Sequence, residues 1–94
     1  MPMATVDITP HLHRFFPALR GRAVHVAAGP VRDVLRAVDA LAPGFTDSVL
    51  DERGALRRHV ALSIDGRIVV DRDTLSDRVG DASTVHVFQA LTGG

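Results

Sequence analysis

The fold is decided by one stretch of the sequence, His59-Val60-Ala61-Leu62-Ser63-Ile64-Asp65-Gly66-Arg67-Ile68-Val69-Val70. Two runs rich in Val, Leu and Ile flank Asp65-Gly66, and such a dipeptide favours the two-residue turn of a β-hairpin, because both of its residues tolerate positive φ angles. The stretch therefore predicts two antiparallel strands, over 59–64 and 67–70.

A second hairpin and a helix are predicted before this stretch. Thr5–Thr9 and Ala23–Val26 alternate polar and apolar residues, as strands with one wet face do, and Arg20–Arg22 can turn the chain between them. Pro30 suits the first turn of a helix, which Pro43-Gly44 would end. Apolar residues spaced by three and four predict one stripe that packs on a sheet. The stripe consists of Val31, Val34, Leu35, Val38 and Leu41.

The rest of the chain adds short elements and one more strand. A helical turn is predicted around Asp47–Leu50 and a loop over Asp51–Gly54, while Leu75–Val79 can close one edge of the core. Thr84–Ala90 is the final strand, expected inside the sheet and parallel to the first strand. The order hairpin, helix, hairpin, strand predicts an α+β domain with a mixed sheet of four or five strands and one main helix on one face.

The final strand also predicts a contact surface. Alternation directs Val85 and Val87 toward the helix and places His86 and Phe88 on the opposite, open face. The inward set is completed from the other strands by Val6, Ile8, Val24, Val26, Val60, Leu62 and Ile64. The open face is expected to hold His25, His59, Ala61 and Ser63 beside Phe88. A large apolar residue there, close to Leu91, indicates a partner-binding surface. Its expected members are Phe88, Leu91, Ala90, Thr92, His86, Ala61 and His59.

Composition excludes several functional classes. The 94 residues suit one domain, and 46% of them are hydrophobic. Eleven Arg balance eleven Asp and Glu, so charge gives no reason to expect nucleic acid or an acidic membrane as a partner. The sequence has no Cys, which excludes disulfides, thiolate metal sites and cysteine nucleophiles. With no apolar run long enough to span a bilayer and no signal sequence, the expected location is the cytoplasm.

Two groups of metal-ligand residue types are present, and neither predicts a metal site. His11 and His13 lie two apart without an evident third ligand. Asp71, Asp73 and Asp77 lack the glycine and glutamate spacing of a calcium loop. We therefore expect no bound metal.

The four residues that follow the expected domain, 1–90, form a glycine tail, Leu91-Thr92-Gly93-Gly94. Four extended residues reach roughly 13 Å, far enough to enter a partner's active site. Without a Cβ, Gly93 and Gly94 can pass a narrow channel and approach a nucleotide phosphate. A partner can use ATP to turn the Gly94 carboxylate into a mixed anhydride, which a sulfur nucleophile attacks to give a thiocarboxylate. Gly94 is thus the predicted reacting residue, positioned through Gly93.

Taken together, these segments resemble the ThiS and MoaD group of sulfur carriers. The resemblance rests on Val6–Thr9, Phe16–Leu19 before Gly21, Val31–Leu41, Val60–Asp65 with Gly66, Val85–Phe88 and Gly93-Gly94. Chain length and the segment Leu50–Val60 look most like the CysO type, which serves an actinobacterial cysteine pathway. Departures are Asp65-Gly66 in place of Asn-Gly, and Gln89–Thr92 where relatives carry Pro or Val, so the pathway stays open.

The resemblance implies a β-grasp, ubiquitin-like fold and a carrier that is not itself an enzyme. It implies activation of Gly94 by an adenylyltransferase related to ubiquitin-activating enzymes, of the MoeB or ThiF kind, and sulfur delivery to a biosynthetic enzyme. ATP would be used by the activating enzyme, with no cofactor bound to the carrier, which is expected to be monomeric alone.

Other functions would use the same fold and tail. One is the small subunit of molybdopterin synthase, whose tail would occupy a large subunit's active site. Another is a protein modifier joined to other proteins by isopeptide bonds; the sequence contains no Lys, so it could not form chains through its own side chains. A third is a ubiquitin-like interaction module whose tail has no role.

Overall fold

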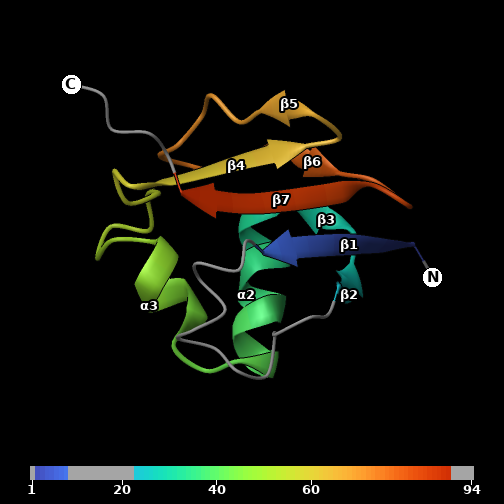
Figure 1. Cartoon of the computed structure of the whole chain (residues 1–94), viewed down its shortest axis with the longest axis horizontal. Helices are drawn as coiled ribbons and strands as arrows, with labels where there is room; N and C mark the ends of the chain where they lie inside the picture. Colours follow the sequence, from blue (N-terminus) through green and yellow to red (C-terminus); the bar gives the residue numbers. More distant parts are fainter. Residues whose placement is uncertain (1, 9–22, 90–94) are drawn as a thin grey trace.

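A mixed five-stranded sheet forms one layer of the molecule, and the main helix lies against one of its faces (Figure 1). The computed structural model describes residues 2–8 and 23–89. The strands of the sheet are β1 Met3–Ile8, β2 Val24–Ala27, β4 Val60–Ile64, β5 Arg67–Ile68 and β7 Thr84–Gln89. Their order across the sheet is β2-β1-β7-β4-β5, with β7 parallel to β1 and antiparallel to β4. The predicted β-grasp architecture, with the last strand beside and parallel to the first, is confirmed.

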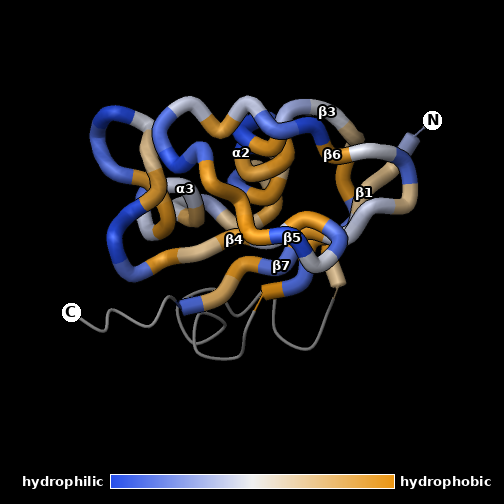
Figure 2. Tube along the Cα trace, turned by 90° about the horizontal axis from the view of Figure 1, so that it is seen from above, coloured by the Kyte–Doolittle hydropathy of each residue, from blue (hydrophilic) through white to orange (hydrophobic). Residues whose placement is uncertain are grey.

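The core lies between this sheet and helix α2, Val31–Leu41. Four of the five residues of the predicted stripe are fully buried, namely Val31, Val34, Leu35 and Val38. Every strand residue predicted to face the helix belongs to the same hydrophobic cluster. In Figure 2 the hydrophobic segments of α2 and of the strands occupy the interior, while hydrophilic colour is concentrated in the connecting loops. Period-two and period-three-to-four patterns therefore assigned the two faces of the core correctly.

Leu41 is the exception, because it is 56% exposed rather than part of the packed stripe. It is the last residue of α2, and the chain turns at once through Ala42, which is 4% exposed, toward Phe45. Phe45 begins the short helix α3, Phe45–Val49, and heads the fully buried side chains ranked by volume. Phe45 and Val49 of α3 thus belong to the hydrophobic core and Leu41 does not; the sequence predicted a helical turn here, at Asp47–Leu50.

The β4–β5 hairpin has the predicted turn. Asp65 and Gly66 have φ angles of 51° and 86°, the left-handed values that this dipeptide accommodates. The Asp65 carboxylate also accepts a hydrogen bond from the backbone amide of Thr84 at 2.9 Å, which joins the turn to the start of β7. Strand β5 is shorter than predicted, since it ends at Ile68, although the Val69 amide still donates to Leu62.

The start of α2 is held by backbone groups from a distant segment. Pro30, at the N-cap, has no side chain that could accept a hydrogen bond. Instead the amides of Val31 and Arg32 donate to the carbonyls of Asp77 and Leu75, at 2.8 and 3.2 Å. A two-stranded ribbon formed by β3, Gly29–Pro30, and β6, Arg78–Val79, fixes this junction. Leu75 is fully buried, so the prediction that this segment closes the core is confirmed.

Several predicted segments lie outside the described residues. They are Thr9, the loop containing Phe16–Leu19, the turn Arg20–Arg22, and the C-terminal residues Ala90–Gly94. Within residues 2–8 and 23–89, no helix combines the length and apolar character that crossing a membrane requires.

Candidate functional site

Strand β7 occupies the centre of the sheet and is the last element that the structure describes. β1 lies on one side of it and β4 on the other, so both of its edges are hydrogen-bonded. Its final residue, Gln89, lies opposite Val60 at the start of β4. The five residues Ala90–Gly94 therefore follow directly from the most firmly paired strand of the sheet.

Phe88 is the apolar centre of the predicted surface. It is half-buried and lies directly opposite Ala61 in the β4–β7 ladder, while the preceding residue of the strand, Val87, is fully buried on the helix side. His59 is exposed and belongs to the turn that precedes β4, one residue before the Val60–Gln89 pair. The structure thus places three of the predicted surface residues, Phe88, Ala61 and His59, at the end of the sheet where β7 finishes.

Polar residues form a row across the same face of the sheet. His86 of β7 lies between Asp7 of β1 and Ser63 of β4 in the strand register. Its Nε2 is 3.6 Å from the Asp7 Oδ2, an ion pair when the imidazole is protonated. On β1 and β2, the Thr5 hydroxyl and the His25 Nδ1 are 3.2 Å apart, in a hydrogen bond. The Asp7–His86 pair was not predicted; only the parallel register of β1 and β7 reveals it.

Ala61 and Ser63 differ from the expectation of an open, solvated position. They are 8% and 7% exposed, respectively, and both are classed with the buried residues. Ala61 lies opposite Phe88 and Ser63 lies opposite His86. Directly opposite residues on one face of a sheet are close enough for a large side chain to cover a small one. On β7 and the turn before β4, the accessible side chains of this face are those of Phe88, His86 and His59, and Ala61 is buried beside Phe88.

The remaining predicted site residues, Ala90, Leu91, Thr92, Gly93 and Gly94, lie outside the described residues, as do His11 and His13. In the parts of the chain that are described, no three His, Asp or Glu side chains are grouped so that they could hold a metal ion. Asp71 instead stabilises its own turn: its carboxylate accepts hydrogen bonds from the backbone amide and hydroxyl of Thr74 and from the hydroxyl of Ser76, and these bonds hold the pKa of Asp71 below its usual range.

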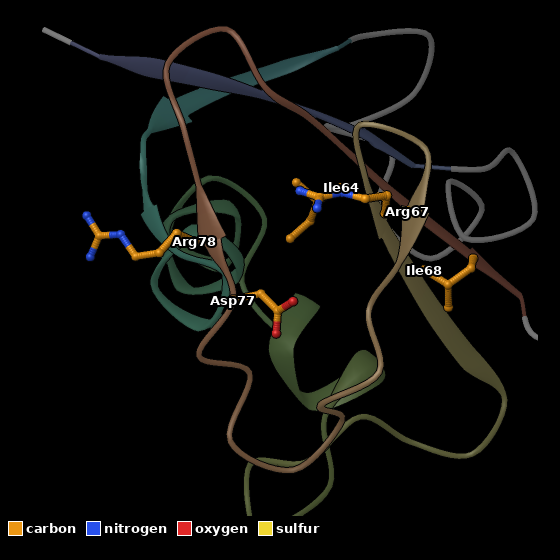
Figure 3. Close-up of a pocket in the computed structure, with 5 residues that line it drawn as sticks. All are labelled: Ile64, Arg67, Ile68, Asp77 and Arg78. Atoms are coloured by element: carbon orange, nitrogen blue, oxygen red, sulfur yellow. The ribbon is translucent and has the colours of Figure 1, made fainter.

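A hollow of about 360 Å³ lies at the other end of the sheet. It is lined by Ile64, Arg67, Ile68, Asp77 and Arg78, between the β4–β5 hairpin and the start of β6 (Figure 3). In this view Arg78 extends away from the hairpin. Ile64 pairs with Val85 at the beginning of β7, whereas the tail follows Gln89 at its end. The length of the sheet thus separates this hollow from Gln89, the last residue that the structure describes.

Comparison with known proteins found similarity in structure only. No protein-family model matches the sequence, and no curated protein matches it. The fold is similar to CysO in the crystal structure of the Amycolatopsis orientalis BexX/CysO complex, with a TM-score of 0.81 and 21% identity, over 97% of this chain and 99% of that chain.

Two further solved structures show the same fold. CysO of Mycobacterium tuberculosis, described as an antigen, has a TM-score of 0.80 and 22% identity over 94% of this chain and 99% of that chain. SAMP1 of Haloferax volcanii has a TM-score of 0.75 and 19% identity over 98% and 99% of the two chains. The resemblance to CysO predicted from the sequence is therefore confirmed at the level of the fold, and the chain has the β-grasp fold of CysO and SAMP1.

Proposed function

We propose that this protein is a sulfur carrier whose reacting group is the carboxylate of Gly94. The observation that carries the proposal is the position of β7: the central strand of a β-grasp sheet runs directly into Ala90–Gly94, which ends in two glycines. Five residues can extend at most about 17 Å, so the folded body can remain outside a partner enzyme while the tail enters it. The β-grasp fold shared with CysO supports the same role.

The chemistry proceeds in two steps on a partner enzyme. The Gly94 carboxylate attacks the α-phosphorus of ATP, forming an acyl adenylate and releasing pyrophosphate. Hydrosulfide sulfur then attacks the acyl carbon, the bond to AMP breaks, and the product is a terminal thiocarboxylate with one proton released. A biosynthetic enzyme would receive the sulfur. The body of the carrier contributes position, because holding the carboxylate in the enzyme's active site replaces a bimolecular encounter.

The face around Phe88 is the proposed docking surface for the activating enzyme. Phe88, His86 and His59 present one aromatic ring and two imidazoles beside the point where β7 ends. Aromatic side chains at the centre of a contact contribute much of the binding energy when a partner covers them. Ala90, Leu91 and Thr92 would extend the same contact toward the active site, so docking and tail insertion occur together.

The experiment that tests the proposal is an intact-mass measurement. The protein is incubated with ATP, a sulfide source and an adenylyltransferase of the MoeB or ThiF kind. Exchange of one oxygen for sulfur adds about 16 mass units, and a variant that lacks Gly94 should show no addition. The positive control is the enzyme's own carrier, which must gain a thiocarboxylate under the same conditions. If the mass of the wild-type protein then stays unchanged, the proposal is refuted.

A second candidate function, protein modification, is favoured by one of the comparisons. SAMP1, which shares the fold, carries the name small archaeal modifier protein 1. Conjugation begins with the same adenylate but ends in an amide bond to a lysine of another protein. The same mass experiment, repeated with cell extract, separates the two functions, because a conjugate grows by the mass of a protein. Because the sequence contains no Lys, this protein could not form chains through its own side chains.

A further inference from the structure

The outer edge of β5 is exposed and apolar. β5 is the terminal strand of the sheet, and no described strand pairs with its free side. Ile68 of β5 is 59% exposed, and Val70, two residues beyond it in the chain, is 87% exposed, although both are large apolar residues. Exposed apolar edge strands are sites where another strand can add, and proteins usually protect them with charge, proline or a covering loop.

The hydrogen-bonding groups of this edge are directed outward. The Val69 amide donates to the Leu62 carbonyl at 2.9 Å, so Val69 belongs to a hydrogen-bonded pair with β4. Ile68 lies opposite Ser63 in the non-hydrogen-bonded position. In an antiparallel ladder these positions alternate, and the N–H and C=O groups of Ile68 and Val70 therefore point away from β4.

The sequence of the edge is complementary to itself. When Arg67–Asp71 is paired antiparallel with a second copy about Val69, each Ile68 lies opposite Val70 of the other chain, and each Arg67 lies opposite Asp71. In this register Ile68 and Val70 occupy the hydrogen-bonded pairs, which is what their outward backbone groups require. Arg67 forms no salt bridge among the described residues. Among the described residues, the Asp71 Oδ1 accepts a hydrogen bond from the Thr74 amide alone, so it can accept a further donor.

We propose that β5 is a self-association edge, through which two copies of this chain pair by their Arg67–Asp71 segments about a two-fold axis. The two sheets then form one continuous sheet, with apolar Ile68–Val70 contacts on one face and Arg67–Asp71 contacts on the other. The sequence-based expectation of a monomer then applies to the dilute protein. The contact is short, so the dimer is weak and the monomer prevails when the protein is dilute.

Self-association of this kind leaves the tail free. β5 pairs with the Ser63–Ile64 end of β4, whereas Gln89 lies opposite Val60 at the other end. β4 also separates β5 from β7 in the sheet. The inference is therefore independent of sulfur carriage: loss of the dimer would not alter the modification of Gly94, and loss of that modification would not alter the dimer.

Dilution of the isotope-labelled protein tests the proposal. In NMR spectra recorded from about 1 mM to about 20 μM, we expect the backbone amide signals of Ile68 and Val70 to shift with concentration. In sedimentation experiments over the same range, the weight-average mass should approach the monomer mass of 10.1 kDa only at the lowest concentration. Ile68→Glu should raise the dissociation constant at least tenfold. Leu41→Lys is the matched control, because Leu41 is 56% exposed and lies on the helix; it should associate like the wild type.

A mixture of two variants identifies the register. Val70→Lys should also weaken self-association. In a mixed dimer of one Ile68→Glu chain and one Val70→Lys chain, however, the new Glu lies opposite the new Lys in one pair, and the other pair keeps the original contact between Ile68 and Val70. We expect the mixture to associate more strongly than either variant alone. A wild-type mass of 10.1 kDa at about 1 mM, or a mixture no stronger than its components, would overturn the proposal.

Discussion

Phe88 of β7 lies directly opposite Ala61 of β4 in the antiparallel ladder, and Ala61 is only 8% exposed. Ala61 is small and buried, and the ring of Phe88 next to it remains partly accessible. Phe88 is also the second-last residue of β7, so a protein that covers it lies next to the start of the tail. Surface and tail are therefore joined by one continuous piece of backbone.

Replacing Phe88 separates docking from folding. We expect Phe88→Ala to lower kcat/KM for adenylation by about tenfold, mainly through a higher KM, because a central aromatic contact is lost. Its melting temperature should fall less than that of Val87→Ala, since Val87 is fully buried and its truncation costs about 2 kcal/mol. Kinetics of pyrophosphate release and thermal unfolding give the two measurements. A larger loss of stability for Phe88→Ala than for Val87→Ala would show that Phe88 belongs to the core.

The penultimate residue tests whether the tail must pass through a narrow channel. Gly93→Ala adds one methyl group on the residue next to Gly94, whose carboxyl group reacts. We expect the rate of adenylation to fall by about tenfold or more, because the backbone can no longer approach the nucleotide as closely. Thr92→Ala is the matched control, since it shortens a side chain outside the diglycine and should retain most of the activity. Equal rates for Gly93→Ala and the wild-type protein would contradict the channel argument.

The hydrophobic pattern determined the fold more fully than the site. Alternation along the strands identified the inward residues of β2, β4 and β7, because burial on one face repeats at a fixed period. On β1 it identified Val6 and Ile8 but missed Ala4, which is fully buried, because the first strand was predicted to begin at Thr5. Leu41 was wrongly placed in the core, since the periodic pattern continues to the last residue of a helix and does not show whether that residue is still covered. The open face was harder to predict. The burial of Ala61 and the pairing of Asp7 with His86 both depend on which strands lie side by side. A sequence pattern within one strand does not reveal which strand becomes its neighbour.

The loop between α2 and α3 depends on one carboxylate. Asp39 Oδ1 accepts hydrogen bonds from the Gly44 amide at 3.2 Å, the Thr46 amide at 3.0 Å and the Thr46 hydroxyl at 3.1 Å. We expect Asp39→Ala to reduce the free energy of unfolding by about 1 kcal/mol, as loss of a helix cap does. Urea unfolding measures the change.

Asp33 provides the control for Asp39. It lies on the same helix, and its contacts with Arg32 and Arg36, both 3.9 Å, are exposed. Exposed ion pairs contribute little, so Asp33→Ala should change stability by less than about 0.5 kcal/mol. If the two variants unfold at the same urea concentration, the Asp39 hydrogen bonds do not stabilise the loop.

Acid should destabilise the protein through aspartates that accept hydrogen bonds from amides and hydroxyls. Hydrogen bonds from the amides of Thr46, Arg53 and Thr84 hold the pKa values of Asp39, Asp51 and Asp65 below the ordinary value, and the Thr74 hydroxyl does so for Asp71. Because the unfolded chain takes up protons at a pKa of about 3.9, it binds more protons than the folded chain below that pH. The stabilisation is therefore present above about pH 4 and is lost as the pH falls through the lower folded values.

Asp65→Asn isolates one of these groups. The amide oxygen of Asn can still accept the hydrogen bond from Thr84, and Asn-Gly suits the same hairpin turn, so we expect the fold to be retained. The melting temperature at pH 7 should be slightly lower than that of the wild-type protein, because Asn lacks the charge that strengthens this hydrogen bond. Asn does not titrate, so the melting temperature of the variant should fall less steeply between about pH 5 and pH 2.5 than that of the wild-type protein. Thermal unfolding followed by circular dichroism across this range makes the comparison. Parallel curves for the two proteins would mean that Asp65 keeps its unfolded pKa in the native state and that acid acts elsewhere.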